Sequence, residues 1–122
     1  MGIEHHQWAA YFKEFNRRNR WRSTRLEVRN YGGARKEEAR GRPLVGLSLE
    51  ADREGSLRLH IMLGEQSVTD PRCQTYTITG VVRVIPKCSP GGRDESLEIE
   101  DEQGEKNLLW FEPPHAICEM RV

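Results

Sequence analysis

The chain has 122 residues, which is enough for one domain and too few for two of ordinary size. Charged residues make up 31% of the chain and apolar residues 36%, and the formal net charge is zero. The apolar residues recur in periodic runs, which excludes a disordered chain, and no run approaches the length of a membrane-spanning helix. We therefore expect a single soluble domain over residues 1–122.

Residues 4–18 predict an amphipathic helix. Four aromatic residues recur at the i, i+3, i+4 and i+7 positions of one face: Trp8, Tyr11, Phe12 and Phe15. A stripe with that much apolar surface needs something to cover, so we expect this helix to pack on a sheet. Core packing is the favoured role of the stripe, and a groove for a ligand or partner is the alternative.

From residue 24 onward the apolar residues alternate with polar ones, which is the period of a strand with one face in water. This pattern predicts strands over residues 24–31, 43–51, 56–63, 74–86, 96–101 and 107–112. Gly80 lies in the middle of the fourth and longest strand, where it predicts a bulge or a sharp bend. Short polar turns join the second strand to the third, and the fifth to the sixth, as β-hairpins.

Residues 32–42 are polar, rich in glycine and of mixed charge, so they predict a flexible loop between the first two strands. A second loop is expected over residues 64–72, and a tail over residues 113–122, where two prolines end the last strand. One helix followed by six strands predicts an α+β fold. In it, the N-terminal amphipathic helix packs on a strongly bent antiparallel six-stranded sheet or small barrel, with the β-domain spanning residues 24–112.

The three cysteines, Cys73, Cys88 and Cys118, cannot all pair with one another, and none stands in a CxxC spacing. Unpaired thiols are typical of a reducing compartment. The N-terminal residues lack the basic and then apolar layout of a secretion signal. We therefore expect a cytoplasmic protein with no membrane partner.

A basic segment, NRRNRWRSTR at residues 16–25, joins the expected helix to the first strand. It belongs to a wider asymmetry, since residues 1–61 carry 13 Lys or Arg and 8 Asp or Glu, a net +5, and the rest of the chain carries −5. Arginines bind phosphates, and an exposed indole stacks on an unpaired base. The candidate contact residues are Arg17, Arg18, Arg20, Trp21, Arg22, Arg25 and Arg29, with Arg35, Lys36, Arg40 and Arg42 extending the basic field from the expected loop.

A structural interpretation of this segment is favoured over a functional one. Cations at the C-terminal end of a helix are stabilised by the helix dipole, and Trp21 can pack beneath the helix as part of the core. The opposite charges of the two halves can likewise meet within the fold. The functional interpretation requires Trp21 to be exposed beside the arginines.

The sequence has no motif for nucleotide binding, nucleophilic hydrolysis or zinc catalysis, since GxGxxG, GxxxxGK[ST], GxSxG, HExxH and CxxC are all missing. His5 and His6 are adjacent, which directs their rings apart on a helix and disfavours a metal site. Cys73 has an arginine neighbour but no nearby histidine to act as its base. Glu98 and Glu100 share one strand face, where paired carboxylates are most often solubilising charge. We expect no cofactor, no metal and no enzymatic activity, with catalysis by Cys73 or these carboxylates as a minor alternative.

A set of core and turn positions is familiar from known proteins: Trp8-x3-Phe12-x2-Phe15, Leu26-Glu27-Val28, Pro43-Leu44-x-Gly46-Leu47, Leu59-x-Ile61-x-Leu63-Gly64, Ile78-x6-Ile85, Leu97-Glu98-Ile99 and Leu108-Leu109-x-Phe111. Over residues 8–112 the chain thereby resembles a family of small single-domain bacterial proteins of unknown function. The resemblance implies a bacterial origin and one compact domain with an N-terminal helix and an antiparallel β-domain, and it carries over no catalytic residue. A weaker likeness to Sm-like barrels concerns topology alone.

The leading hypothesis is a non-enzymatic binding or accessory domain that acts through surface contacts with a protein or another acidic partner. Its contact surface is expected to be a strand edge or the arginine face. The alternative is nucleic-acid binding through the same face, with Trp21 as a stacking platform.

Overall fold

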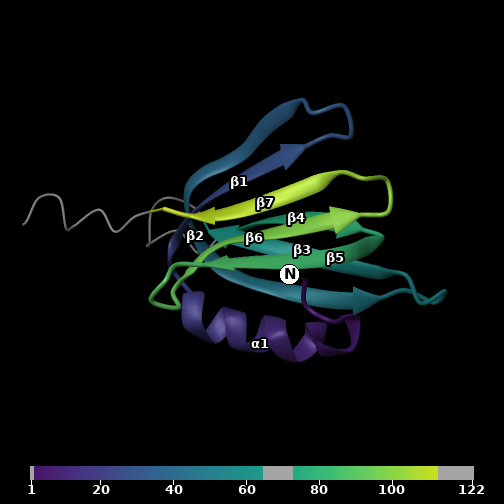
Figure 1. Cartoon of the computed structure of the whole chain (residues 1–122), viewed down its shortest axis with the longest axis horizontal. Helices are drawn as coiled ribbons and strands as arrows, with labels where there is room; N and C mark the ends of the chain where they lie inside the picture. Colours follow the sequence, from purple (N-terminus) through teal and green to yellow (C-terminus); the bar gives the residue numbers. More distant parts are fainter. Residues whose placement is uncertain (1, 65–72, 113–122) are drawn as a thin grey trace, which may run out of the picture.

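The computed structural model describes residues 2–64 and 73–112, so the expected tail at 113–122 and most of the expected 64–72 loop lie outside the described residues. One turn of 3-10 helix, η1 (His5–Gln7), leads into the α-helix α1 (Trp8–Asn19). Seven strands follow within the described ranges, namely β1 (Ser23–Arg29), β2 (Arg35–Ala51), β3 (Leu57–Gly64), β4 (Cys73–Thr79), β5 (Val81–Cys88), β6 (Asp94–Asp101) and β7 (Lys106–Phe111) (Figure 1). The α+β class with one N-terminal helix is confirmed.

The strands form one antiparallel sheet in the order β4-β3-β2-β1-β7-β6-β5. The expectation of six strands, or of a small barrel, is wrong, because the sheet has seven strands and stays open between its edge strands β4 and β5. The strand predicted over residues 74–86 is divided into these two strands by Gly80, which has a φ of 68°. The bend predicted at Gly80 is present, and it is sharp enough to send the two strands to opposite edges of the sheet.

β2 is a strand of 17 residues, and its first half occupies most of the loop predicted at 32–42. That prediction is wrong because the chain from Arg35 to Pro43 pairs with β1. The second half, from Leu44 to Ala51, pairs with β3 along the other edge of β2. The first half lacks the apolar alternation of a half-buried strand, since its first three residues are all exposed.

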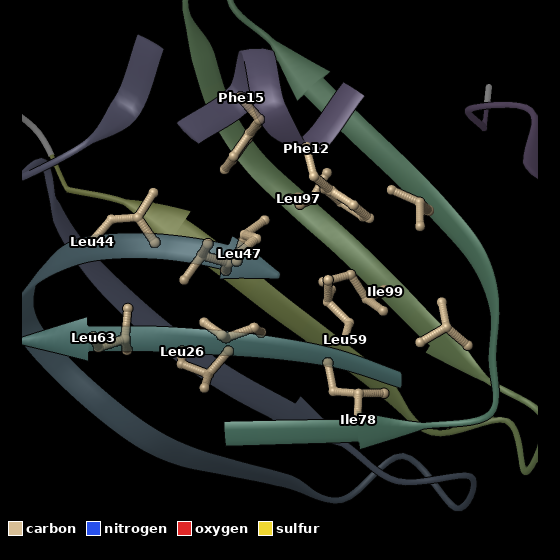
Figure 2. Packing of buried hydrophobic residues seen from close by; sticks show 14 of the residues in the cluster. Phe12, Phe15, Leu26, Leu44, Leu47, Leu59, Leu63, Ile78, Leu97 and Ile99 are labelled. Carbon is tan, nitrogen blue, oxygen red and sulfur yellow. The ribbon is translucent and has the colours of Figure 1, made fainter. Parts of the chain in front are cut away.

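α1 packs its aromatic stripe against the inner side of the bent sheet, so the core role predicted for the stripe is confirmed. Phe12 and Phe15 point from the helix toward the strands that carry Leu47 and Leu97 (Figure 2). Tyr11 is only partly buried. The buried apolar core comprises Trp8, Phe12, Phe15, Leu26, Ala39, Leu44, Leu47, Leu59, Ile61, Leu63, Ile78, Val81, Val84, Leu97, Ile99 and Leu109.

α1 also bonds directly to the backbone of β2. The Asn16 side chain donates from Nδ2 to the Leu47 carbonyl oxygen at 2.9 Å, and its Oδ1 accepts from the Leu47 N–H at 2.8 Å. A carboxamide that both donates to and accepts from one residue takes the place of a neighbouring strand. These two hydrogen bonds fix α1 to the edge of β2. The Asn16 side chain thereby binds an extended backbone in the way a paired strand would.

Candidate functional site

The basic segment forms the junction between α1 and β1, at the left end of the sheet in Figure 1. Trp21 is 65% exposed in this junction, so it is not part of the core, and its φ is 72°. The Trp21 N–H donates to the Leu44 carbonyl oxygen at 2.7 Å, and the Leu44 N–H donates to the Arg22 carbonyl oxygen at 2.9 Å. These bonds to β2 hold Trp21 in the left-handed conformation. The exposure that a contact role requires is therefore present.

Arg18 serves as an anchor between distant parts of the chain. Its Nε and Nη2 donate to the two carboxylate oxygens of Asp94 at 2.9 and 3.3 Å, and Asn19 Nδ2 donates to the same carboxylate at 2.9 Å. Asp94 is buried at the start of β6. Burial alone would raise the Asp94 pKa, but the hydrogen bonds from Arg18 and Asn19 outweigh it and hold the pKa below its ordinary value. This cluster ties the last turn of α1 to the turn between β5 and β6.

Arg22 belongs to the same anchor. Its Nη1 donates to Asn19 Oδ1 at 2.7 Å and to the Asp94 carbonyl oxygen at 3.0 Å. Its guanidinium also lies 4.1 Å from the centre of the Phe111 ring. Arg18 and Arg22 therefore both stabilise the fold, which agrees with the structural interpretation of the segment.

The other arginines of the predicted face are dispersed. Arg17 pairs with Glu14 on the exposed side of α1 at 2.7 Å, and Arg25 lies over the Trp110 ring at 5.4 Å. Arg29 pairs with Glu27 at 2.8 Å at the far end of β1, roughly 20 Å along the strand from its start. Arg29 therefore lies well away from the junction that carries the other predicted contact residues.

Arg20 and Trp21 remain at the tip of the junction. Arg20 is exposed and makes no ion pair with any residue in the ranges 2–64 and 73–112. Arg17 lies on the adjacent turn of α1 with an exposed side chain. We call the three exposed residues Arg17, Arg20 and Trp21 at the end of α1 the Trp21 patch.

A second feature was not predicted from the sequence. A cavity of about 600 Å³ opens between β4 and the β1–β2 hairpin, a volume within the range of roughly 300–1,000 Å³ that is typical of ligand pockets. It lies at the end of the sheet opposite the Trp21 patch, where the β1–β2 and β6–β7 turns are found (Figure 1). Its lining consists of Leu26, Val28, Asn30, Ala34, Arg35, Lys36, Glu38, Thr75, Tyr76, Thr77, Ile78, Glu105 and Asn107.

Asn107 is the unusual residue of this cavity. It lies on β7 on the same face as the core residue Leu109, because side chains two positions apart share a face of a strand. It is only 7% exposed, and its amide makes no hydrogen bond with the part of the chain that the structure describes. A polar residue in phase with the apolar residues of NLLWF is the sequence signal that marks such a position.

Among the described residues, the thiols and carboxylates that could carry catalysis have individual environments. Burial, reinforced by the nearby Asp94 carboxylate, raises the pKa of the Cys88 thiol, which disfavours the nucleophilic thiolate. His60 places Nδ1 2.9 Å from the Thr77 hydroxyl and Nε2 2.9 Å from Glu50. These three polar residues lie on neighbouring strands, and such cross-strand rows are common on the outer face of a sheet. Arg83 pairs with Glu100 across the sheet at 2.7 Å, which gives that carboxylate a structural partner.

Within residues 2–64 and 73–112, no group of three or more His, Cys, Asp or Glu side chains is placed to hold a metal ion. His5 instead stacks against Trp8, with ring centres 4.5 Å apart. No helix among these residues has the length and apolar character needed to cross a bilayer.

Comparison with known proteins places the chain in a family. Neither the curated proteins nor the solved structures include a match. The model of one protein family, described as a family of unknown function (DUF5335), matches residues 1–120. The resemblance carried by the core positions is thus confirmed, and the helix followed by an antiparallel sheet agrees with it. The chain belongs to the DUF5335 family of unknown function.

Proposed function

We propose that the chain is a non-enzymatic binding domain that contacts an acidic region of a protein through the Trp21 patch. The observation that supports this proposal is the exposure of Trp21 in a left-handed conformation. A non-glycine residue in that conformation costs roughly 1–2 kcal/mol. An exposed indole also forgoes the stabilisation that burial would give it. Stability alone favours glycine at this position, so a contact role accounts for the tryptophan.

The composition of the patch supports a protein partner. Tryptophan and arginine are the residues most enriched among those that dominate protein–protein binding energy. Arg20 lies next to Trp21 and is free of ion pairs within the described ranges, so its charge is available to an acidic partner. The surrounding backbone is held by hydrogen bonds to β2, which limits the ordering cost of binding.

Single-stranded nucleic acid is the second candidate partner, because an exposed indole can stack on an unpaired base. Nucleic-acid affinity depends mainly on the number of cations that neutralise phosphates. Arg18 and Arg22 are held by Asp94 and Asn19, which leaves Arg17 and Arg20 as the cations of the patch. The few cations left beside Trp21 favour the protein partner over this alternative.

The proposal is tested by comparing the proteins captured by the wild type with those captured by Trp21→Gly. Glycine suits the left-handed conformation, so this variant keeps the fold while it removes the indole. Val82→Ala, which trims an exposed apolar residue on β5, is the matched control. We expect a stoichiometric partner that is retained by the control and lost by Trp21→Gly. Equal capture by all three proteins would overturn the proposal.

A salt titration with an oligothymidylate probe separates the two candidates. Under the protein-partner proposal the probe binds weakly or not at all, even at low salt. Tight binding that falls steeply with salt and loses about 1–3 kcal/mol in Trp21→Gly would instead establish the nucleic-acid alternative.

A further inference from the structure

We propose that the cavity between β4 and the β1–β2 hairpin binds an extended, uncharged peptide segment of a partner protein. The segment adds as a strand to the free edge of β4 and directs alternate side chains into the cavity. Strand addition of this kind combines backbone hydrogen bonds, which give affinity, with side-chain pockets, which give specificity. This site is separate from the Trp21 patch and does not depend on the function proposed for it.

The cavity reaches the edge of β4 rather than one face alone. Four consecutive residues of β4, from Thr75 to Ile78, line it. Successive side chains of a strand point to opposite faces, so a space bordered by four in a row must adjoin the edge of the strand. The Tyr76 hydroxyl lies 3.4 Å from the Glu38 carbonyl oxygen of β2, which marks the other side of the opening.

The hydrogen-bonding pattern shows which backbone groups are available at this edge. Gly80 donates to the Leu57 carbonyl oxygen, which makes these two residues a hydrogen-bonded pair of the β3–β4 ladder. Hydrogen-bonded and non-hydrogen-bonded pairs alternate along antiparallel strands. Thr75 and Thr77 therefore fall in non-hydrogen-bonded pairs with β3, and their N–H and C=O groups face the free edge. These groups are the ones that an added strand would use.

The edge of β4 also lacks the features that normally prevent strand addition. Edge strands are commonly protected by charges, prolines or a covering segment. β5, the opposite edge, has Arg83, Pro86 and Lys87, and the Ile3 N–H donates to the Val84 carbonyl oxygen at 2.8 Å. β4, with the sequence CQTYTIT, has neither charge nor proline. Among the described residues, β4 is therefore the edge that carries no charge, proline or covering segment.

Asn107 indicates the chemistry of the side chains that enter the cavity. Asn107 is 7% exposed and lines the cavity, and its amide is not among the enclosed side-chain atoms of the described residues that lack a hydrogen-bond partner, so the amide is accessible from the cavity and can bond to a ligand group. Leu26, Val28 and Ile78 supply the apolar part of the same lining. We infer a segment that brings one amide or hydroxyl side chain to Asn107 and an apolar side chain to the adjacent surface.

The charged residues that line the cavity favour an uncharged peptide segment. Its lining contains two basic residues, Arg35 and Lys36, and two acidic residues, Glu38 and Glu105. Lys36 already lies 3.6 Å from Glu38, and Arg35 lies 3.8 Å from the Glu27 carboxylate. A charged residue on the incoming strand would have to compete with these pairs.

The proposal is tested with a displayed library of random nine-residue peptides panned against the whole protein. We expect enrichment of uncharged sequences that alternate in polarity. Two variants then separate the edge from the cavity. Thr77→Pro removes an edge-facing N–H that β3 does not use, and proline is tolerated at such positions. Asn107→Leu removes the amide while keeping a similar volume.

Each variant is expected to weaken binding of the enriched peptide by about tenfold, the effect of one lost hydrogen bond in a buried site. Val82→Ala, which trims an exposed residue on the opposite edge strand β5, is the control that should bind as the wild type does. Thermal unfolding of all three variants establishes that they are folded. No enrichment, or binding that survives both Thr77→Pro and Asn107→Leu, would overturn the proposal.

Two other occupants of the site would give different results. If sedimentation shows a dimer of the wild type that Thr77→Pro dissociates, the edge belongs to a second copy of this chain and the peptide proposal is wrong. If Asn107→Leu abolishes binding but Thr77→Pro does not, the cavity takes a compact ligand without strand addition, which also overturns the proposal.

Discussion

Arg18 and Asp94 are 76 residues apart in the chain and form a two-point ion pair at 2.9 and 3.3 Å. Arg18 comes from the last turn of α1, and Asp94 begins β6. Asn19 and Arg22 complete the cluster, so four polar residues join the helix end to the β5–β6 turn. The basic segment thus has a structural role that explains part of its unusual composition.

Removing the buried carboxylate should destabilise the protein. Asp94→Ala leaves Arg18 without its acceptor and removes one of the two hydrogen bonds donated by the Asn19 amide, and we expect a loss of about 2–3 kcal/mol in the free energy of unfolding. Urea unfolding measures the loss. Glu14→Ala, which breaks the exposed pair with Arg17, is the matched control and should leave the stability unchanged. Similar losses in the two variants would contradict the anchoring role of Asp94.

The same carboxylate predicts a dependence of stability on pH. The pKa of Asp94 is lower in the folded protein than its ordinary value of 3.8. Its contribution is therefore complete above 3.8 and is lost as the pH falls through the folded pKa. We expect the stability difference between the wild type and Asp94→Asn to be constant near neutral pH and to shrink below 3.8. A difference that stays constant into acid would show that Asp94 does not act through its charge.

Much of this fold can be predicted from the sequence where one face of an element is buried. The alternation of Leu57, Leu59, Ile61 and Leu63 identifies β3, and the aromatic spacing identifies α1. The first half of β2 could not be predicted, because a charged segment that is exposed at several positions has no apolar period. The open form of the sheet could not be predicted either. The direction of the chain after Gly80 depends on its backbone hydrogen bonds with Leu57 and Glu102, which lie in distant parts of the sequence.

The candidate sites could likewise be predicted from the sequence only in part. The arginines of residues 17–25 are visible as a cluster in the sequence, but their partners are not. Asp94 is too far along the chain for spacing to reveal its contact with Arg18. The cavity depends on which strands face each other, so Asn107 looks like an ordinary strand residue until the register of β7 is known. What the sequence cannot supply here is long-range pairing.

Tyr11 offers a prediction of increased stability. Its hydroxyl is buried and has no hydrogen-bond partner among the described residues, and burial, reinforced by Asp94, raises its pKa to about 12. Tyr11→Phe removes the unsatisfied hydroxyl and should raise the free energy of unfolding by about 1 kcal/mol. Tyr31→Phe, at a residue that is 89% exposed, is the control and should change nothing.

The raised pKa of Tyr11 has its own consequence at alkaline pH. A group whose pKa is raised by folding contributes stability below its ordinary value, and that contribution is lost as the pH rises through the folded value. The wild type should therefore lose stability between pH 10 and about 12 relative to Tyr11→Phe. Parallel stability curves for the two proteins over this range would refute the assignment.

Trp21 predicts a separation between stability and binding. Trp21→Gly relieves the left-handed conformation and Trp21→Ala does not, so we expect the glycine variant to be more stable than the alanine variant by about 1 kcal/mol. Both variants lack the indole, and both should lose the partner of the Trp21 patch. Equal thermal stability of the two variants would show that the backbone at residue 21 relaxes in solution.

Gly80 is the position at which a single methyl group should disturb the fold most clearly. Its φ is 68°, and an added Cβ would lie 2.7 Å from the Glu102 side chain. Gly80→Ala therefore combines a conformational cost of roughly 1–2 kcal/mol with a steric cost. Gly55→Ala, with a φ of 85° and open space around the new Cβ, carries the conformational cost alone. We expect Gly80→Ala to be the more destabilising of the two.

A double-mutant cycle separates the two costs at Gly80. Glu102 is exposed, so Glu102→Ala should have little effect on its own. Combined with Gly80→Ala it removes the clash, and the remaining loss should approach that of Gly55→Ala. If the double variant is no more stable than Gly80→Ala, the cost lies in the backbone bend itself. In that case the two edge strands are held apart by the hydrogen bond that Gly80 donates to Leu57 and the one that it accepts from Glu102, rather than by the side chain of Glu102.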